Sequence, residues 1–275
     1  VDLHPRAPWR WIAARTWPRP LRAVHVPDLG DAVLFTAGGT AGVVGAALRR
    51  PGRPVVQIQH PRIDPARFDV VVVNRHDGLT GPNVVVTRTA LHPATPARLA
   101  AAAAEWAPRL AHLPRPLAAV LVGGSNGRFR LDAAVARALG VQLADMMRLD
   151  RVGLALTPSR RTSPDARAAL HAAIAPGGGW MWDGTGENPY FGLLALADAI
   201  VVTEDSVSMV SEAVATCAPV LLAGLPGRSR RIRLFNRLLM QDGRIRPFGR
   251  LDVWPVAPID DTQAAADDVR RRLGL

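Results

Sequence analysis

The chain has 275 residues, a formal net charge of +11 at pH 7 and a hydrophobic share of 48%. That length suggests two domains, and the hydrophobic share is too high for a disordered protein. Arginine carries every basic side-chain charge, because the sequence contains no lysine. Such a surplus favours anionic partners. The arginines are scattered, however, and only 5% of the residues are aromatic, which argues against a nucleic acid as the partner.

Cys217 is the only cysteine, which excludes an intrachain disulfide and a cysteine metal cluster. No signal peptide and no apolar run of membrane-spanning length is visible, so the predicted location is cytoplasmic. Trp9, Trp11 and Trp17 stand among arginines and suggest peripheral contact with an anionic inner-membrane surface. The prolines of this segment favour the alternative, an irregular edge helix. The chain starts with Val1 rather than Met, and we expect that an amino-terminal portion is missing.

The first half of the chain alternates strand and helix patterns. Predicted strands cover residues 32–36, 55–59, 68–74 and 84–87, and predicted helices cover 41–50 and 93–113. Between the first strand and helix, Gly38-Gly39-Thr40 is a predicted tight turn and a weak phosphate-loop candidate. His76 and Asp77 follow the third strand. Ligands of parallel sheets bind beyond the carboxyl ends of strands, so this pair is a candidate acid–base pair, although turn residues are the simpler interpretation.

A proline-rich segment at residues 112–116 is the predicted domain boundary. Beyond it, predicted strands cover residues 117–122, 153–157, 180–182, 199–203 and 220–223. The helices between and after them cover 131–148, 165–174, 207–216, 234–241 and 261–275. We therefore predict an α/β protein of two Rossmann-like domains with a cleft between them. The predicted domains are 1–113 and 117–260, followed by the terminal helix 261–275.

Two turns of the second domain are suited to an anion. Gly123, Gly124 and Ser125 form a glycine-rich turn where backbone can approach a ligand closely. Ser159, Arg160 and Arg161 follow another strand, and guanidinium groups pair bidentately with phosphate oxygens.

The pattern of residues 199–216 predicts a strand, a polar turn and a helix. Ser206, Val207 and Ser208 begin the helix, where unpaired N–H groups attract anions. Glu212 lies nearly two turns further on and could accept hydrogen bonds from sugar hydroxyls. The simpler alternative is a helix cap followed by a solvated glutamate.

These motifs together resemble the bacterial branch of the mitochondrial-fission (elongated mitochondria) family, whose fold is similar to GT-B glycosyltransferases. The resemblance runs from about Phe35 to Phe248 and is carried by short motifs spread over both halves. In the first half they are Gln57–Gln59, Pro61-Arg62, Phe68-Asp69, His76-Asp77, Asn83-Val84 and Ala90–His92. In the second they are Gly123-Gly124, Ser159–Thr162, Trp182–Gly184, Asn188-Pro189, Ala197–Ala199, Asp205–Met209, Ser211–Ala213 and Arg246–Phe248.

The resemblance implies a nucleotide-sugar site in the second domain, because the carboxy-terminal domain of GT-B enzymes holds the donor. It implies that Glu212 binds the ribose and that Ser206–Ser208 receives the diphosphate, with Asn188 and Asp205 in the same site. The family's opening strand has no counterpart here, and the usual Gly-Arg-Arg-Thr turn is replaced around Gly38–Thr40. These departures concern the acceptor side.

The leading hypothesis is a GT-B-type glycosyltransferase that uses a nucleotide-diphosphate sugar as substrate, with no cofactor. Without an Asp-x-Asp motif at a strand end, arginines and a helix terminus would replace a metal ion. His76 or Asp77 would be the base for an acceptor that the sequence does not identify. The alternative is a non-catalytic scaffold of the same fold, used for membrane-surface or protein interaction.

Overall fold

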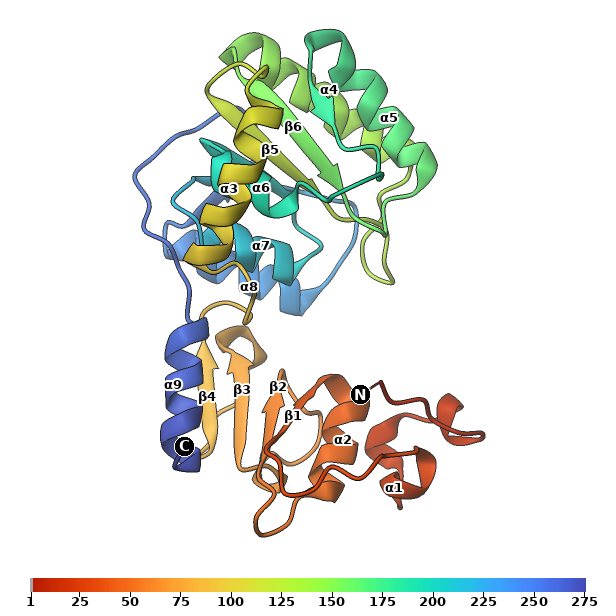
Figure 1. The fold of residues 1–275 in the computed structure, drawn as a ribbon. Coiled ribbons are helices and arrows are strands. Elements are labelled where there is room, and N and C mark those ends of the chain that lie inside the picture. Colours follow the sequence, from red (N-terminus) through yellow and green to blue (C-terminus); the bar gives the residue numbers. More distant parts are fainter. Residues whose placement is uncertain (1) are drawn as a thin grey trace. The chain divides into compact units, whose positions relative to one another are not determined.

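The structure, a computed structural model, describes residues 2–275 and divides into two compact units (Figure 1). The smaller unit comprises the chain up to Ala90 together with Asp261–Leu275, and the larger unit comprises Leu91–Asp260. Both units contain a parallel β-sheet with helices, as the alternating sequence pattern predicts.

The sheet of the smaller unit has four parallel strands in chain order: β1 (Leu34–Ala37), β2 (Val55–Ile58), β3 (Val70–Asn74) and β4 (Val84–Thr87). Valine dominates the inner strands, as expected for strands covered on both faces. Helix α2 (Gly38–Leu48) follows β1, and the terminal helix α9 (Thr262–Leu273) returns to β4 (Figure 1). Arg88, directly after β4, pairs with Asp261 before α9 at 2.5 Å.

The sheet of the larger unit has six parallel strands in the order β10-β9-β8-β5-β6-β7. They are β5 (Leu117–Val122), β6 (Gly153–Pro158), β7 (Trp180–Met181), β8 (Ala199–Thr203), β9 (Val220–Ala223) and β10 (Ile245–Pro247). The chain first builds outward from β5 to β7 and then crosses back to place β8 on the other side of β5. Such a reversal creates a topological switch point, here between β5 and β8, where ligands of open α/β sheets bind.

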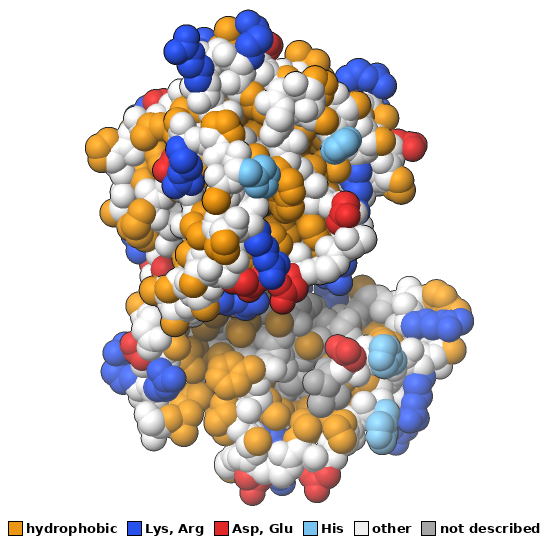
Figure 2. All heavy atoms as spheres, turned by 45° about the horizontal axis from the view of Figure 1, so that its top comes forward, with side chains coloured by type: hydrophobic (Ala, Val, Ile, Leu, Met, Phe, Trp, Pro, Cys, Tyr) orange, Lys and Arg blue, Asp and Glu red, His pale blue; other side chains and the backbone are white. Residues whose placement is uncertain are grey.

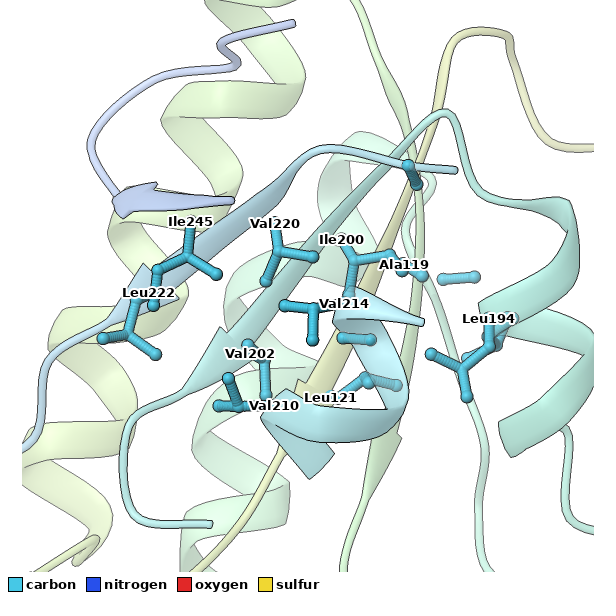
Figure 3. Packing of buried hydrophobic residues seen from close by; sticks show 14 of the residues in the cluster. Ala119, Leu121, Leu194, Ile200, Val202, Val210, Val214, Val220, Leu222 and Ile245 are labelled. Carbon is cyan, nitrogen blue, oxygen red and sulfur yellow. The ribbon is translucent and has the colours of Figure 1, made fainter. Parts of the chain in front are cut away.

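Successive residues of β5 face opposite sides of this sheet. Ala119 and Leu121 join a core shared with α3 (Pro96–Leu110), α6 (Tyr190–Leu196), α7 (Val207–Val214) and α8 (Arg230–Gln241). The alternate positions join a core shared with α4 (Ala133–Asp150) and α5 (Pro164–Ile174). Figure 3 shows Val210 and Val214 of α7 lying against Ile200 and Val202 of β8. The carboxyl ends of the central strands are therefore held between two packed helical layers.

The boundary between the units lies at Ala90–Leu91, whereas composition predicts it at the proline-rich segment after Leu113. The reason is helix α3. Its buried residues Trp106 and Leu110 pack into the core of the larger unit, and the Trp106 side chain lies against Gly192 of α6. Prolines mark an irregular segment, but the packing of the preceding helix decides to which unit that segment belongs.

Most predicted elements are present, several with their predicted ends, such as β4, β5, β8 and β9. Gly38–Thr40 differs: it is the first turn of α2 and not a separate loop. Helix α8 begins at Arg230, four residues before the predicted start. Helix α6 and strand β10 were not predicted, because α6 is a short apolar run without a clear period and β10 is a three-residue strand, Ile-Arg-Pro, with one buried residue.

From residue 2 to residue 33 the described elements are short helices, η1 (Trp9–Trp11), η2 (Ala14–Thr16) and α1 (Pro20–Ala23). Trp17 is buried and meets the Trp9 ring edge-to-face at 6.3 Å, whereas Trp11 is 68% exposed. The segment is thus the irregular edge that its prolines favour, with one exposed tryptophan. None of the helices described is long and apolar enough to cross a membrane. On the face drawn in Figure 2, arginines of the larger unit stand apart among apolar side chains.

The α3–α6 contact can be tested with Gly192→Ala. A Cβ atom there would lie 2.4 Å from the Trp106 ring, so the helices must separate or the ring must move. We expect a loss of about 1–3 kcal/mol in the free energy of unfolding, measured by urea denaturation. Gly127→Ala is the control, because a Cβ at Gly127 meets nothing within 4 Å. Equal stability of the two variants would contradict the packing described.

Candidate nucleotide-binding site

The switch point between β5 and β8 is closed by hydrogen bonds within the protein. Gly123 N donates to Thr203 Oγ1 at 2.8 Å, and Gly124 N donates to Asp205 Oδ2 at 3.2 Å. Thr203 in turn donates to the other oxygen of Asp205 at 2.7 Å. The side chain of Asp205 is fully buried, so it acts as a brace between the ends of the two strands.

The turn after β6 joins the same network. Arg161 pairs with Asp205 at 2.8 Å, and Ser159 donates to the carbonyl of Gly123 at 2.9 Å. A Cβ on Gly123 would lie 2.2 Å from Asp205, and one on Gly124 would lie 2.3 Å from the Arg161 backbone. A larger residue at Gly123 or Gly124 would therefore clash with its neighbours within the protein. Their predicted role in close approach to a ligand stays a prediction.

Helix α7 starts as its sequence predicts. Ser206 is its N-cap, and its hydroxyl accepts a hydrogen bond from Met209 N at 3.3 Å. Val207 and Ser208 are the first two helical residues, and Ser208 is exposed. The first N–H groups of a helix have no partner inside it, so this terminus can receive an anion.

Ser125 and Asn188, two other predicted site residues, support local backbone. The Ser125 hydroxyl accepts from Leu131 N at 2.9 Å, and the Asn188 side chain accepts from Tyr190 N at 3.0 Å. Ser125 thus holds the loop after β5 in shape, and Asn188 holds the entry to α6.

Glu212 is not the solvated glutamate of the simpler interpretation. Its carboxylate is half-buried and accepts a hydrogen bond from the Tyr190 hydroxyl at 2.5 Å. Burial raises the pKa of Glu212 above its usual range, while Tyr190, His92 and Arg98 act in the opposite direction. Burial and the nearby Glu212 charge raise the pKa of Tyr190 as well. Glu212 is thus an acceptor in an environment of hydrogen-bond donors and positive charge.

A cavity of about 540 Å³ opens beside this pair, at the carboxyl ends of β5 and β6. Tyr190 connects the two, because it lines the cavity and also donates to Glu212. Ser159, Arg160 and Asn188 of the predicted site line it, together with Arg167, Trp182, Tyr190 and Met209, which were not predicted as site residues.

The lining of this cavity is cationic. Arg160 and Arg167 both contribute, and no aspartate or glutamate is among the lining residues. Arg167 Nη2 donates to the carbonyl of Ser159 at 3.1 Å, which ties α5 to the turn after β6. Arg167 was not predicted as a site residue, since it lies inside a predicted helix. Trp182 belongs to a motif of the family resemblance but carried no assigned role.

The predicted base residues lie in the smaller unit. His76 and Asp77 form part of η4 (Arg75–Asp77), the turn at the carboxyl end of β3, and both side chains are buried. His76 Nε2 is 3.9 Å from Asp77 Oδ1. This position agrees with the predicted turn, and the acid–base role stays a prediction.

The carboxylates that come nearest to an Asp-x-Asp metal motif are Glu204 and Asp205, at the end of β8. Both are bonded to other groups of the protein. Glu204 accepts from Leu225 N at 2.8 Å, and Asp205 pairs with Arg161. Within residues 2–275, no group of three His, Cys, Asp or Glu side chains is placed to hold a metal ion.

The burial of Glu212 has a consequence for stability. Because its pKa in the folded protein lies above the ordinary value of 4.5, the folded state is penalised for ionising it. Glu212→Gln keeps an acceptor for Tyr190 and removes this penalty. We expect the variant to be more stable than the parent protein at pH 7, with the difference shrinking as the pH falls toward 5. Denaturant titrations across this range measure it, and a destabilised variant at pH 7 would contradict the assignment.

Comparison with known proteins agrees with this architecture. Residues 1–273 match the family model described as Mitochondrial fission ELM1. The mitochondrial fission protein ELM1 of Arabidopsis thaliana is 32% identical, with 89% of this chain and 64% of that protein aligned. This chain therefore spans less than two thirds of the Arabidopsis protein. An uncharacterized protein of Rickettsia prowazekii is 23% identical, with 91% and 82% covered.

Among solved structures, the UDP-GlcNAc 2-epimerase of Methanocaldococcus jannaschii superposes with a TM-score of 0.57 at 12% identity. The superposition covers 88% of this chain and 77% of the epimerase. This likeness shows the fold, two Rossmann-like units of GT-B type. With nearly its whole length matched, the chain belongs to the mitochondrial fission ELM1 family.

Proposed function

We propose that this chain binds a nucleotide-diphosphate sugar in its larger unit and transfers the sugar without a metal ion. The observation that carries the proposal is the cationic cavity at the strand ends, coupled through Tyr190 to the half-buried Glu212. A pocket with a few convergent polar groups and a carboxylate of raised pKa is the expected form of a ligand site. The solved enzyme of similar fold is named for a nucleotide sugar, UDP-GlcNAc, which is the ligand class proposed here.

Each part of such a donor has a matching group. In this proposal the aromatic base lies in the cavity beside Trp182. The ribose hydroxyls donate to Glu212, which is not among the described lining residues and is connected to the cavity through Tyr190. In this proposal the diphosphate binds Arg160, which lines the cavity, and the start of α7 at the exposed Ser208, because guanidinium and helix N–H groups both bind phosphate oxygens. These positive groups would neutralise the charge that a metal ion neutralises in other transferases.

In the proposed reaction an acceptor hydroxyl attacks the anomeric carbon of the sugar, and the bond from that carbon to the diphosphate oxygen breaks. The nucleoside diphosphate leaves with the bonding electrons, and its charge is stabilised by Arg160 and the α7 terminus. The acceptor proton passes to His76 or Asp77, the proposed base.

The donor site is tested with Arg160→Gln. Losing a charged hydrogen bond to phosphate is expected to weaken nucleoside-diphosphate binding by about 1–3 kcal/mol, measured by calorimetry with and without EDTA. EDTA is expected to leave the affinity unchanged. Arg148→Gln is the matched control, because Arg148 is an exposed arginine of α4 that pairs with Asp145. Unchanged nucleoside-diphosphate affinity in Arg160→Gln, or binding that requires magnesium, would refute the proposed donor site.

The base is tested by turnover. His76→Ala or Asp77→Ala is expected to lower the transfer rate by roughly 10²–10⁴, while donor affinity stays unchanged. The assay follows release of the nucleoside diphosphate from a panel of donors and acceptors. Full turnover in both variants would remove these residues from the mechanism.

A second candidate function is a non-catalytic scaffold of the same fold. It is favoured by the closed switch point, where the amides of Gly123 and Gly124 are bonded to Thr203 and Asp205. Arg161 is likewise committed to Asp205. A scaffold would bind no donor, or would bind one without transferring or hydrolysing it, whereas the enzyme would turn over at least one donor.

A further inference from the structure

A second group of arginines lies in the larger unit, apart from the cavity described above. It is formed by two loops, residues 126–131 after β5 and 224–229 after β9, and by the outer face of α8. We call it the arginine surface. Its members are exposed side chains that share these elements: Arg128, Arg228, Arg230, Arg233 and Arg237.

The two loops are fixed to each other and to the core. Arg228 N donates to the carbonyl of Arg128 at 2.9 Å, next to an antiparallel bridge between Phe129 and Gly227. A Cβ on Gly227 would lie 2.2 Å from that same carbonyl oxygen, so only glycine allows the loops to meet. Phe129 is 3% exposed and anchors the pair in the core. The arginines thus project from a rigid base.

The charge of this surface is not balanced by the protein. Four of its members, Arg228, Arg230, Arg233 and Arg237, lie between Leu225 and Gln241, a stretch of the sequence without aspartate or glutamate. Among residues 2–275, no carboxylate forms an ion pair with any member of the arginine surface, whereas neighbouring Arg130 pairs with Asp132 at 3.2 Å. An uncompensated cluster of fixed positive charges attracts anions.

The surface is extended. Helix α8 has 12 residues and is therefore about 18 Å long. Arg230, Arg233 and Arg237 follow one another at helical spacing along its outer face. Leu234 and Met240 lie among them and are 38% and 36% exposed. One small anion cannot contact all the arginines along α8, but a membrane surface with anionic headgroups can.

We propose that the arginine surface binds the face of a membrane that contains anionic phospholipids. Guanidinium groups pair with lipid phosphates, and exposed apolar side chains between them can enter the headgroup layer. The inference stands apart from the proposed transferase activity. A nucleic acid fits less well, since the exposed large aromatic side chains, Trp11 and Phe35, belong to the smaller unit.

The test measures partition of the full chain onto vesicles of phosphatidylcholine, with and without phosphatidylglycerol. Binding is expected only with phosphatidylglycerol and is expected to fall as salt rises. The double variant Arg233→Gln, Arg237→Gln should lower the partition coefficient roughly 30-fold, because each arginine near an anionic surface contributes about a fivefold gain. Leu234→Asn with Met240→Asn should also weaken binding, although it leaves the net charge unchanged.

The matched control is Arg137→Gln with Arg148→Gln, which removes two exposed arginines from α4 of the same unit. It should bind vesicles like the parent protein. Equal loss in the control, or no loss in the α8 variant, would overturn the proposal. Binding to double-stranded DNA that the α8 variant loses, with no binding to vesicles, would assign the surface to nucleic acid instead. Thermal melting confirms that each variant is folded.

Discussion

The buried carboxylate of Asp205 is the constraint on which the larger unit depends. It receives hydrogen bonds from Gly124 N and the Thr203 hydroxyl, and it pairs with Arg161. These partners come from the ends of three neighbouring strands, β5, β8 and β6. A buried charge that lost these partners would be expensive, so the three strand ends must stay together.

The candidate site uses the residues that this network leaves available. Arg161 forms an ion pair with Asp205, whereas its neighbour Arg160 lines the cavity together with Arg167 from the next helix. In the same way, Ser206 is used as a helix cap while Ser208 remains exposed. Neighbouring residues of one motif thus differ: Arg161 and Ser206 are bonded within the protein, whereas Arg160 lines the cavity and Ser208 is exposed.

Neither the family name nor the fold decides the function of this chain. The Arabidopsis relative is named for mitochondrial fission, and the similar solved structure is a sugar-nucleotide epimerase. Fold alone decides neither, because one fold hosts many activities. The cationic cavity argues for a ligand, and the arginine surface defined above argues for an anionic membrane. The two features use different residues of the larger unit.

The sequence by itself determined the fold class, most strands and the start of α7. Unbroken valine and leucine runs predict strands, and Ser206 before an amphipathic segment predicts a helix start. Both signals lie within one short segment of the sequence and do not depend on distant residues. Tertiary structure alone decided that α3 belongs to the larger unit, that Glu212 is half-buried against Tyr190, and that Arg160 and Arg167 share one cavity. These facts depend on side chains far apart in the chain, and a single sequence carries no signal for which of them meet.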